Sequence, residues 1–186
     1  MAPDLSRISS VTRFPRVLLV ENNFSIVEPL IRTFGDRRLD FDFDVCTSVG
    51  NAAKKLLASP YQLVISGTHL AEINDFLLLK HTHSINTFLP LVITAGTSEK
   101  ESARRALAKG AFDLIVTPLD HEQTVSTIRR ALWQSKLMTL IACKEKAVEK
   151  YRDHIAAYPS GSEMDTILKR LFRRLRSQLF LTNRAF

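Results

Sequence analysis

Several residue types that could do chemistry occur in this chain of 186 residues, but few lie at spacings that define a site. Cys46 and Cys143 lie 97 positions apart, which matches neither metal-ligand spacing nor a disulfide framework and is typical of a reducing, cytoplasmic setting. Glu21 and His69 are ligand types that could hold a transition metal, but no third ligand is evident. No base and nucleophile with an orienting partner can be recognised either. The sequence therefore predicts no cofactor, no metal and no enzymatic activity.

The positive charge of the chain is concentrated at one end. The formal net charge is +7, and residues 138–186 supply +5 of it, with ten Lys or Arg against five Asp or Glu. Part of this charge lies on one predicted helix that could bind nucleic acid or an acidic membrane surface; its basic residues are Lys169, Arg170, Arg173, Arg174 and Arg176. The aromatic residues of this helix do not alternate with the arginines as in a stacking platform. A solvated helix face is the favoured interpretation, and nucleic-acid binding is the minority hypothesis.

A regular series of strands and helices must position these residues. Apolar runs alternate with amphipathic segments and predict strands at 17–20, 41–46, 63–65, 91–94 and 114–116. Helices are predicted at 26–34, 51–59, 73–83, 98–109 and from Asp120 onward, and Pro29 implies that the first of them starts late or bends. Strands that each precede a helix form a parallel sheet with helices on both faces, which is a doubly wound α/β fold. No apolar run approaches the about 20 residues that a membrane span requires.

The last helix is expected to continue beyond the sheet domain, because no Gly or Pro occurs between Asp120 and Tyr158. Residues 159–161 should interrupt it, and a second helix from Ser162 completes a helical hairpin. The predicted divisions are a flexible N-terminal arm at 1–14, the α/β domain at 15–137 and the hairpin at 138–186. Apolar residues recur along both helices of the hairpin, in a pattern that predicts dimerisation or partner binding; they include Ile141, Val148, Tyr151, Ile155, Ile167, Leu171, Phe172 and Leu175.

Four segments of residues 15–137 resemble, in order and spacing, the receiver domain of two-component response regulators. They are RVLLVENN at 16–23, YQLVISG at 61–67, LVITA at 91–95 and KGAFDLIVTP at 109–118. The last of these resembles the family's Gly-Ala turn, fifth strand and cis-proline motif. The resemblance implies a flavodoxin-like sheet with strand order 2-1-3-4-5.

The residues that the family uses for phosphoryl transfer are largely replaced. The resemblance implies a nucleophilic aspartate at position 67, an acidic pair at 21–22 and a lysine at 117, but the chain has Gly67, Glu21, Asn22 and Thr117. A carboxylate nucleophile, hard oxygen ligands for Mg²⁺ and a cation for the phosphoryl oxygens are therefore missing or weakened. This pattern predicts a degenerate phosphorylation pocket, in a pseudo-receiver that lacks the phosphoacceptor aspartate.

Thr94 corresponds in this resemblance to the family's switch hydroxyl, and two interpretations of its role are open. It could reach toward a ligand in the pocket, or it could end its strand and cap its own loop, which is the favoured interpretation because its partners are lost.

The leading functional hypothesis is a phosphorylation-independent signalling adaptor. It would form a homodimer, or bind a protein of a signalling pathway, through its C-terminal helices. The alternative is a transcriptional or RNA-binding regulator that reads nucleic acid with the basic C-terminal helix.

Overall fold

The computed structural model describes residues 14–36, 40–71 and 76–156, and helical residues 166–167, 169–171 and 173. The chain divides into two compact units, residues 1–136 and 137–186. The arm predicted at residues 1–14 lies outside the described residues except for Phe14, and so it stays a prediction.

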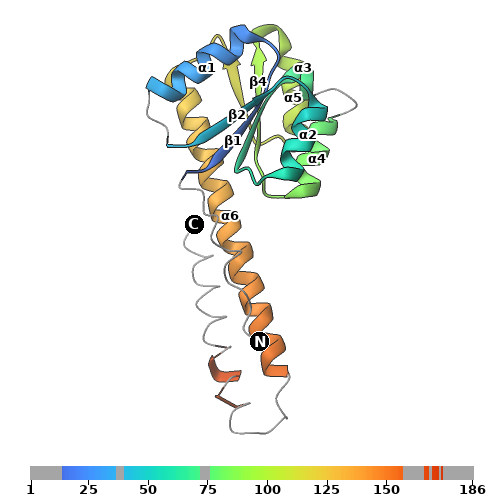
Figure 1. The fold of residues 1–186 in the computed structure, drawn as a ribbon, viewed down its shortest axis with the longest axis vertical. Coiled ribbons are helices and arrows are strands. Elements are labelled where there is room, and N and C mark those ends of the chain that lie inside the picture. Colours follow the sequence, from blue (N-terminus) through green and yellow to red (C-terminus); the bar gives the residue numbers. More distant parts are fainter. Residues whose placement is uncertain are drawn as a thin grey trace. The chain divides into compact units, whose positions relative to one another are not determined.

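The first unit is built on a five-stranded parallel sheet with strand order 2-1-3-4-5 (Figure 1). Its strands are β1 (Arg16–Val20), β2 (Asp42–Cys46), β3 (Leu63–Gly67), β4 (Leu91–Gly96) and β5 (Asp113–Thr117). The three central strands are almost wholly buried, which explains why their sequences are continuous apolar runs. The predicted doubly wound α/β fold and its strand order are confirmed.

Helices cover both faces of this sheet. They are α1 (Phe24–Asp36), α2 (Val49–Ala58), α3 (Thr68–Ala71), α4 (Leu77–Ile85), α5 (Lys100–Ala108) and α6 (His121–Ala156). Side chains of α1 and the beginning of α6 pack with one set of strand residues, among them Leu19 and Ile65. Side chains of α2, α3, α4 and α5 pack with the set that points to the opposite face, among them Leu18 and Val64. The two-residue period of the strands therefore divides the core into two layers.

Two predicted helices differ from those in the structure. The first one begins at Phe24, five residues before Pro29, so the alternative of a late start is wrong and the alternative of a bend at Pro29 stays a prediction. Asn23 caps it, because its side chain accepts from the Ser25 amide at 3.0 Å. The helix predicted at 73–83 corresponds to α4, which begins at Leu77. The short helix α3, which follows β3, was not predicted. Residues 72–75 between them lie outside the described residues.

The predicted long helix is confirmed as α6, whose 36 residues correspond to about 54 Å at 1.5 Å per residue. Asp120 caps it, because its Oδ1 accepts from the Gln123 amide at 2.9 Å. The Thr117–Pro118 peptide bond is cis, as the resemblance implied. Residues 157–165 lie outside the described residues, so the hairpin stays a prediction. No helix in the described ranges has the length and apolar character needed to cross a membrane.

Candidate functional site

The candidate site lies where β1, β3 and β4 end side by side. The sheet register aligns Val20 with Ser66 and Gly67 with Thr94, and Glu21 follows directly after β1. Ligands of open α/β sheets bind at the carboxyl ends of the strands. Four predicted pocket residues therefore lie together at the carboxyl end of the sheet, where folds of this kind bind their ligands. They are Glu21, Asn22, Gly67 and Thr94.

The Glu21 side chain is buried, with 1% of the residue exposed. Its Oε1 accepts from the backbone amides of Asn22 and Asn23, both at 2.9 Å, and its Oε2 accepts from the Thr94 hydroxyl at 3.3 Å. A carboxylate removed from water needs such donors, since an unsatisfied buried charge is costly. Three neutral donors therefore hold this buried carboxylate in one orientation.

Gly67 lies directly against that carboxylate. A Cβ atom built on Gly67 would lie 2.3 Å from Glu21 Oε2 and 3.0 Å from both Glu21 Cδ and His69 Cε1. No side chain can start from position 67 while Glu21 keeps this position, because the first of these separations is far below van der Waals contact. The Glu21 carboxylate thus occupies the space that a residue-67 side chain would need.

His69 covers the same carboxylate from the solvent side. Its Nε2 lies 2.7 Å from Asn22 Oδ1 and 3.6 Å from Glu21 Oε1, and its side chain is half-exposed. The contact with an amide oxygen implies that Nε2 carries a hydrogen. No group of three His, Cys, Asp or Glu side chains suited to a metal occurs in the described part of the chain.

The remaining two pocket residues differ in their contacts. Thr94 does not end its strand, since β4 continues to Gly96, and its hydroxyl donates to Glu21 and not to its own loop. The favoured interpretation of Thr94 is therefore wrong. Thr117 lies on β5 opposite Gly96, and no hydrogen bond among the described residues joins it to the other four pocket residues.

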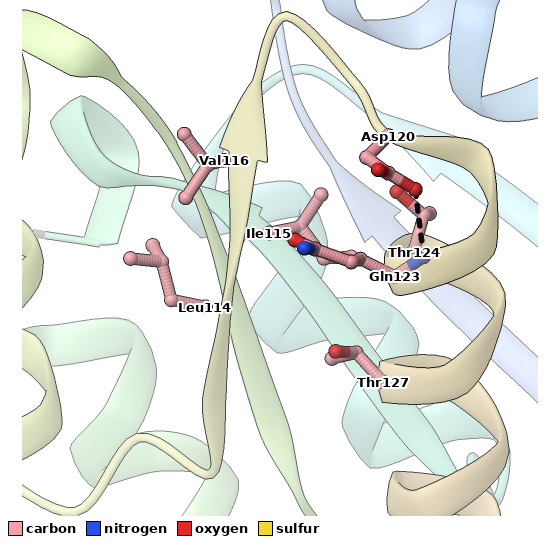
Figure 2. A pocket seen from close by; sticks show the side chains of 7 residues that line it. All are labelled: Leu114, Ile115, Val116, Asp120, Gln123, Thr124 and Thr127. Carbon is pink, nitrogen blue, oxygen red and sulfur yellow. Dashed lines mark hydrogen bonds between the residues drawn. The ribbon is translucent and has the colours of Figure 1, made fainter.

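A separate small cavity lies between β5 and α6 (Figure 2). It has a volume of about 30 Å³, which corresponds to roughly one water molecule. Its lining contains none of the predicted pocket residues; it consists of Leu114, Ile115, Val116, Asp120, Gln123, Thr124 and Thr127. The cavity is too small for a ligand of substrate size.

Asp44 is the centre of a polar cluster near β2. Its carboxylate accepts from Arg16 at 2.6 Å, from the Tyr61 hydroxyl at 2.8 Å and from Lys55 at 3.4 Å. The Tyr61 hydrogen bond is the main cause that lowers the pKa of Asp44 below its usual value, aided by Arg16 and Lys55 and opposed by burial. Burial and the same hydrogen bond raise the pKa of Tyr61 to about 12. Burial also raises the pKa of the neighbouring Cys46 thiol. Through Asp44 the cluster connects β2 with Arg16 of β1 and Lys55 of α2.

The described part of the second unit carries several of the predicted partner-binding residues. Ile141 and Val148 lie half-buried on α6, and Ile167 and Leu171 are exposed. The side chains of Tyr151, Ile155, Phe172 and Leu175 lie outside the described residues.

The chain is similar to several curated proteins and solved structures. Over 119 residues, 62% of this chain, it is 27% identical to the transcriptional regulatory protein ZraR of Escherichia coli K12, and over 123 residues it is 26% identical to the regulatory protein AtoC of the same strain. The matches support the receiver-domain family of response regulators. The chain spans about a quarter of the length of each of these two relatives. No family model matches the chain.

Solved receiver domains have the same fold. The signal receiver domain of an HD domain-containing protein from Pseudomonas fluorescens Pf-5 superposes with a TM-score of 0.61 at 22% identity, covering 70% of this chain and 96% of that one. The receiver domain of NtrX from Brucella abortus gives a TM-score of 0.56 at 23% identity, covering 62% and 97%. The likeness to these solved structures shows a shared fold.

Proposed function

We propose that this chain is a phosphorylation-independent pseudo-receiver, a non-enzymatic signalling adaptor that dimerises or docks a protein partner through its C-terminal helices. The observation that carries the proposal is the position of Glu21. Its Oε2 lies 2.3 Å from the place of a Cβ on residue 67, where the receiver family would carry the phosphoacceptor aspartate. The pocket therefore lacks the nucleophile, and its space is already filled by a carboxylate.

The hydrogen bonds of Glu21 also argue against a bound divalent cation. Mg²⁺ requires several hard oxygen ligands in octahedral geometry. Both Glu21 oxygens already accept from N–H or O–H donors, and the neighbouring Asn22 amide oxygen contacts His69. A cation would have to displace these donors, and it would meet one carboxylate where the family provides three.

Treatment of the full chain with acetyl phosphate and Mg²⁺, followed by intact-mass spectrometry, tests the phosphorylation part of the proposal. We expect no phosphoryl adduct, and we expect no saturable Mg²⁺-dependent shift of the Glu21 or Asn22 amide resonances in NMR spectra. A stoichiometric adduct would refute the proposal, because it would show that the pocket still performs phosphoryl transfer.

The described surface of the C-terminal helices supports the adaptor part of the proposal. Leu140 on α6 is 53% exposed, and Ile167 and Leu171 are 46% and 52% exposed. Apolar residues that recur on helix faces in this way are typical of surfaces that another helix covers. Dimers with twofold symmetry are the commonest way in which two copies of a chain cover such faces.

Light scattering at tens of micromolar protein tests the dimer. We expect a dimer for the full chain and a monomer for the double variant Ile141→Glu/Val148→Glu, whose charges would fall within the interface. Lys146→Glu is the matched control, because Lys146 is exposed on the same helix, and it should remain dimeric. If the parent chain is monomeric, the dimer is refuted, and binding of a different protein is then the proposed function of these helices.

A nucleic-acid regulator is the second candidate function. Lys169, Arg170 and Arg173 are exposed among the described residues. Some relatives are named transcriptional regulators, and this chain spans about a quarter of their length. A gel shift at 50 and 200 mM salt separates the candidates, because binding to phosphates weakens steeply with salt. Tight, salt-dependent binding would favour the regulator over the adaptor.

A cytoplasmic location is part of the proposal. Cys46 and Cys143 are both free, as is usual where cellular thiols are kept reduced.

A further inference from the structure

The outer edge of β2 is open in the part of the chain that the structure describes, since β2 ends the sheet and pairs only with β1. The Asp42 amide donates to Pro15 O at 2.9 Å, and Cys46 O accepts from the Glu21 amide at 2.9 Å. These residues direct their main-chain groups toward β1. Because the direction alternates along a strand, the N–H and C=O groups of Phe43 and Val45 point to the open edge.

Phe43 and Val45 also have exposed side chains. They are 39% and 37% exposed, and Phe14, which lies two residues before β1, is 37% exposed. Phe43 lies on the face covered by α1, where its ring centroid is 5.8 Å from that of Phe34. An open edge that combines unpaired main-chain groups with apolar side chains invites another strand, and most proteins protect such edges.

The opposite face of the same strand is acidic. Asp44 is already bound by Arg16, Lys55 and Tyr61, whereas Asp42 is exposed, and Asp40 just before the strand is exposed too. Two copies of β2 paired edge to edge would bring these carboxylates close together, and like charges on facing strands are destabilising. The charge therefore disfavours a second copy of this chain and favours a basic segment.

We propose that the open edge of β2 is a docking site for an extended segment of a partner protein, in which apolar residues alternate with Lys or Arg. The segment adds a sixth strand beside β2. Its main chain hydrogen-bonds to Phe43 and Val45, its apolar side chains cover these two residues beside α1, and its basic side chains lie near Asp42 on the other face. This inference rests on the adaptor function proposed above and specifies the chemistry of a partner.

The probe is a synthetic peptide, acetyl-VKVKVKV-amide, titrated into the isotope-labelled full chain and followed by NMR. We expect saturable shifts of the Phe43 and Val45 amides. The matched peptide acetyl-VEVEVEV-amide should bind at least tenfold more weakly, because its charges would meet Asp42. A version of the lysine peptide with N-methyl groups at every second residue lacks the backbone N–H groups that would face β2. It should lose binding, because it cannot donate hydrogen bonds to the outward C=O groups of Phe43 and Val45.

Two variants test the edge itself. Val45→Pro removes the outward amide hydrogen and leaves the inward-pointing groups of Asp42 and Cys46 for β1, so peptide binding should fall at least tenfold. Asp42→Lys keeps every main-chain group and should weaken the lysine peptide by a similar factor while strengthening the glutamate peptide. Glu101→Lys, an exposed acidic residue of α5, is the matched control and should bind the lysine peptide normally.

Several outcomes would overturn the proposal. These are shifts that map outside β2, equal binding of the two peptides, and unchanged binding to both Val45→Pro and Asp42→Lys. Two further outcomes would assign the edge to another occupant and also overturn the proposal. If Val45→Pro abolished a dimer of the chain, the occupant would be a second copy. If the peptide bound only after deletion of residues 1–13, the occupant would be the N-terminal segment of the chain itself. Labelling by acetyl phosphate would instead refute the phosphorylation-independent function and leave this titration interpretable.

Discussion

The contact between Glu21 and Gly67 predicts a large effect for a single added methyl group. In Gly67→Ala the new Cβ would lie 2.3 Å from Glu21 Oε2, so the carboxylate must move by about 0.7 Å to reach even the shortest tolerated separation of 3.0 Å. Such a shift disrupts the bond from Thr94 and strains those from Asn22 and Asn23. Since hydrogen bonds to a charged group contribute about 1.5–3 kcal/mol each, we expect Gly67→Ala to lower the free energy of unfolding by about 2–3 kcal/mol.

A double-mutant cycle in urea, followed by circular dichroism, tests this explanation. Glu21→Ala alone is also destabilising, because it leaves two backbone amides without their acceptor. In the double variant Gly67→Ala/Glu21→Ala the overlap disappears, so its loss of stability should be smaller than the sum of the single losses by about 2 kcal/mol. Gly50→Ala is the control, since a Cβ there meets nothing within 4 Å, and it should not destabilise. Additive losses, or a Gly67→Ala variant as stable as the parent, would refute the reasoning.

Three further predictions concern the pocket, the acidic cluster and the helix cap. Gly67→Asp alone should remain unlabelled by acetyl phosphate in intact-mass spectra, because Glu21 still fills the space and Thr117 supplies no cation; efficient labelling would contradict the assigned pocket. Asp44→Asn should cost about 1 kcal/mol of unfolding free energy at pH 7. Because folding lowers the pKa of Asp44, its contribution is complete above the usual carboxyl pKa of about 4 and is lost as the pH falls through the lowered value. A difference from the parent that does not decrease as the pH of the urea titrations is lowered would contradict this. Asp120→Ala removes the acceptor for the Gln123 amide at the start of α6 and should cost about 1 kcal/mol by the same measurement, whereas an unchanged midpoint would show that the cap contributes nothing.

The strands and helices of the first unit could be predicted because their signals are local. Each central strand is an apolar run that is buried on both faces, and the alternation of strands and helices leaves few topologies other than a parallel sheet. The prediction failed where local rules compete. Pro29 did not delay α1, because the Asn23 cap starts the helix five residues earlier. The short helix α3 follows β3 directly and has no strong periodic signal.

The sequence by itself determined which chemical groups the pocket contains, since Gly67, Asn22 and Thr117 are read directly and cannot act as a nucleophile, a second carboxylate or a cation. Only the tertiary structure decided how Glu21 uses the space, because a side chain that follows β1 contacts the glycine that ends β3 only when the sheet register aligns the two strand ends. The same holds for Thr94, whose hydroxyl could have bonded its own loop and instead donates to Glu21. The predicted strand order already puts β2 at the end of the sheet. Only the hydrogen bonds to β1 decide that Asp42 and Cys46 direct their main-chain groups inward and that those of Phe43 and Val45 point outward.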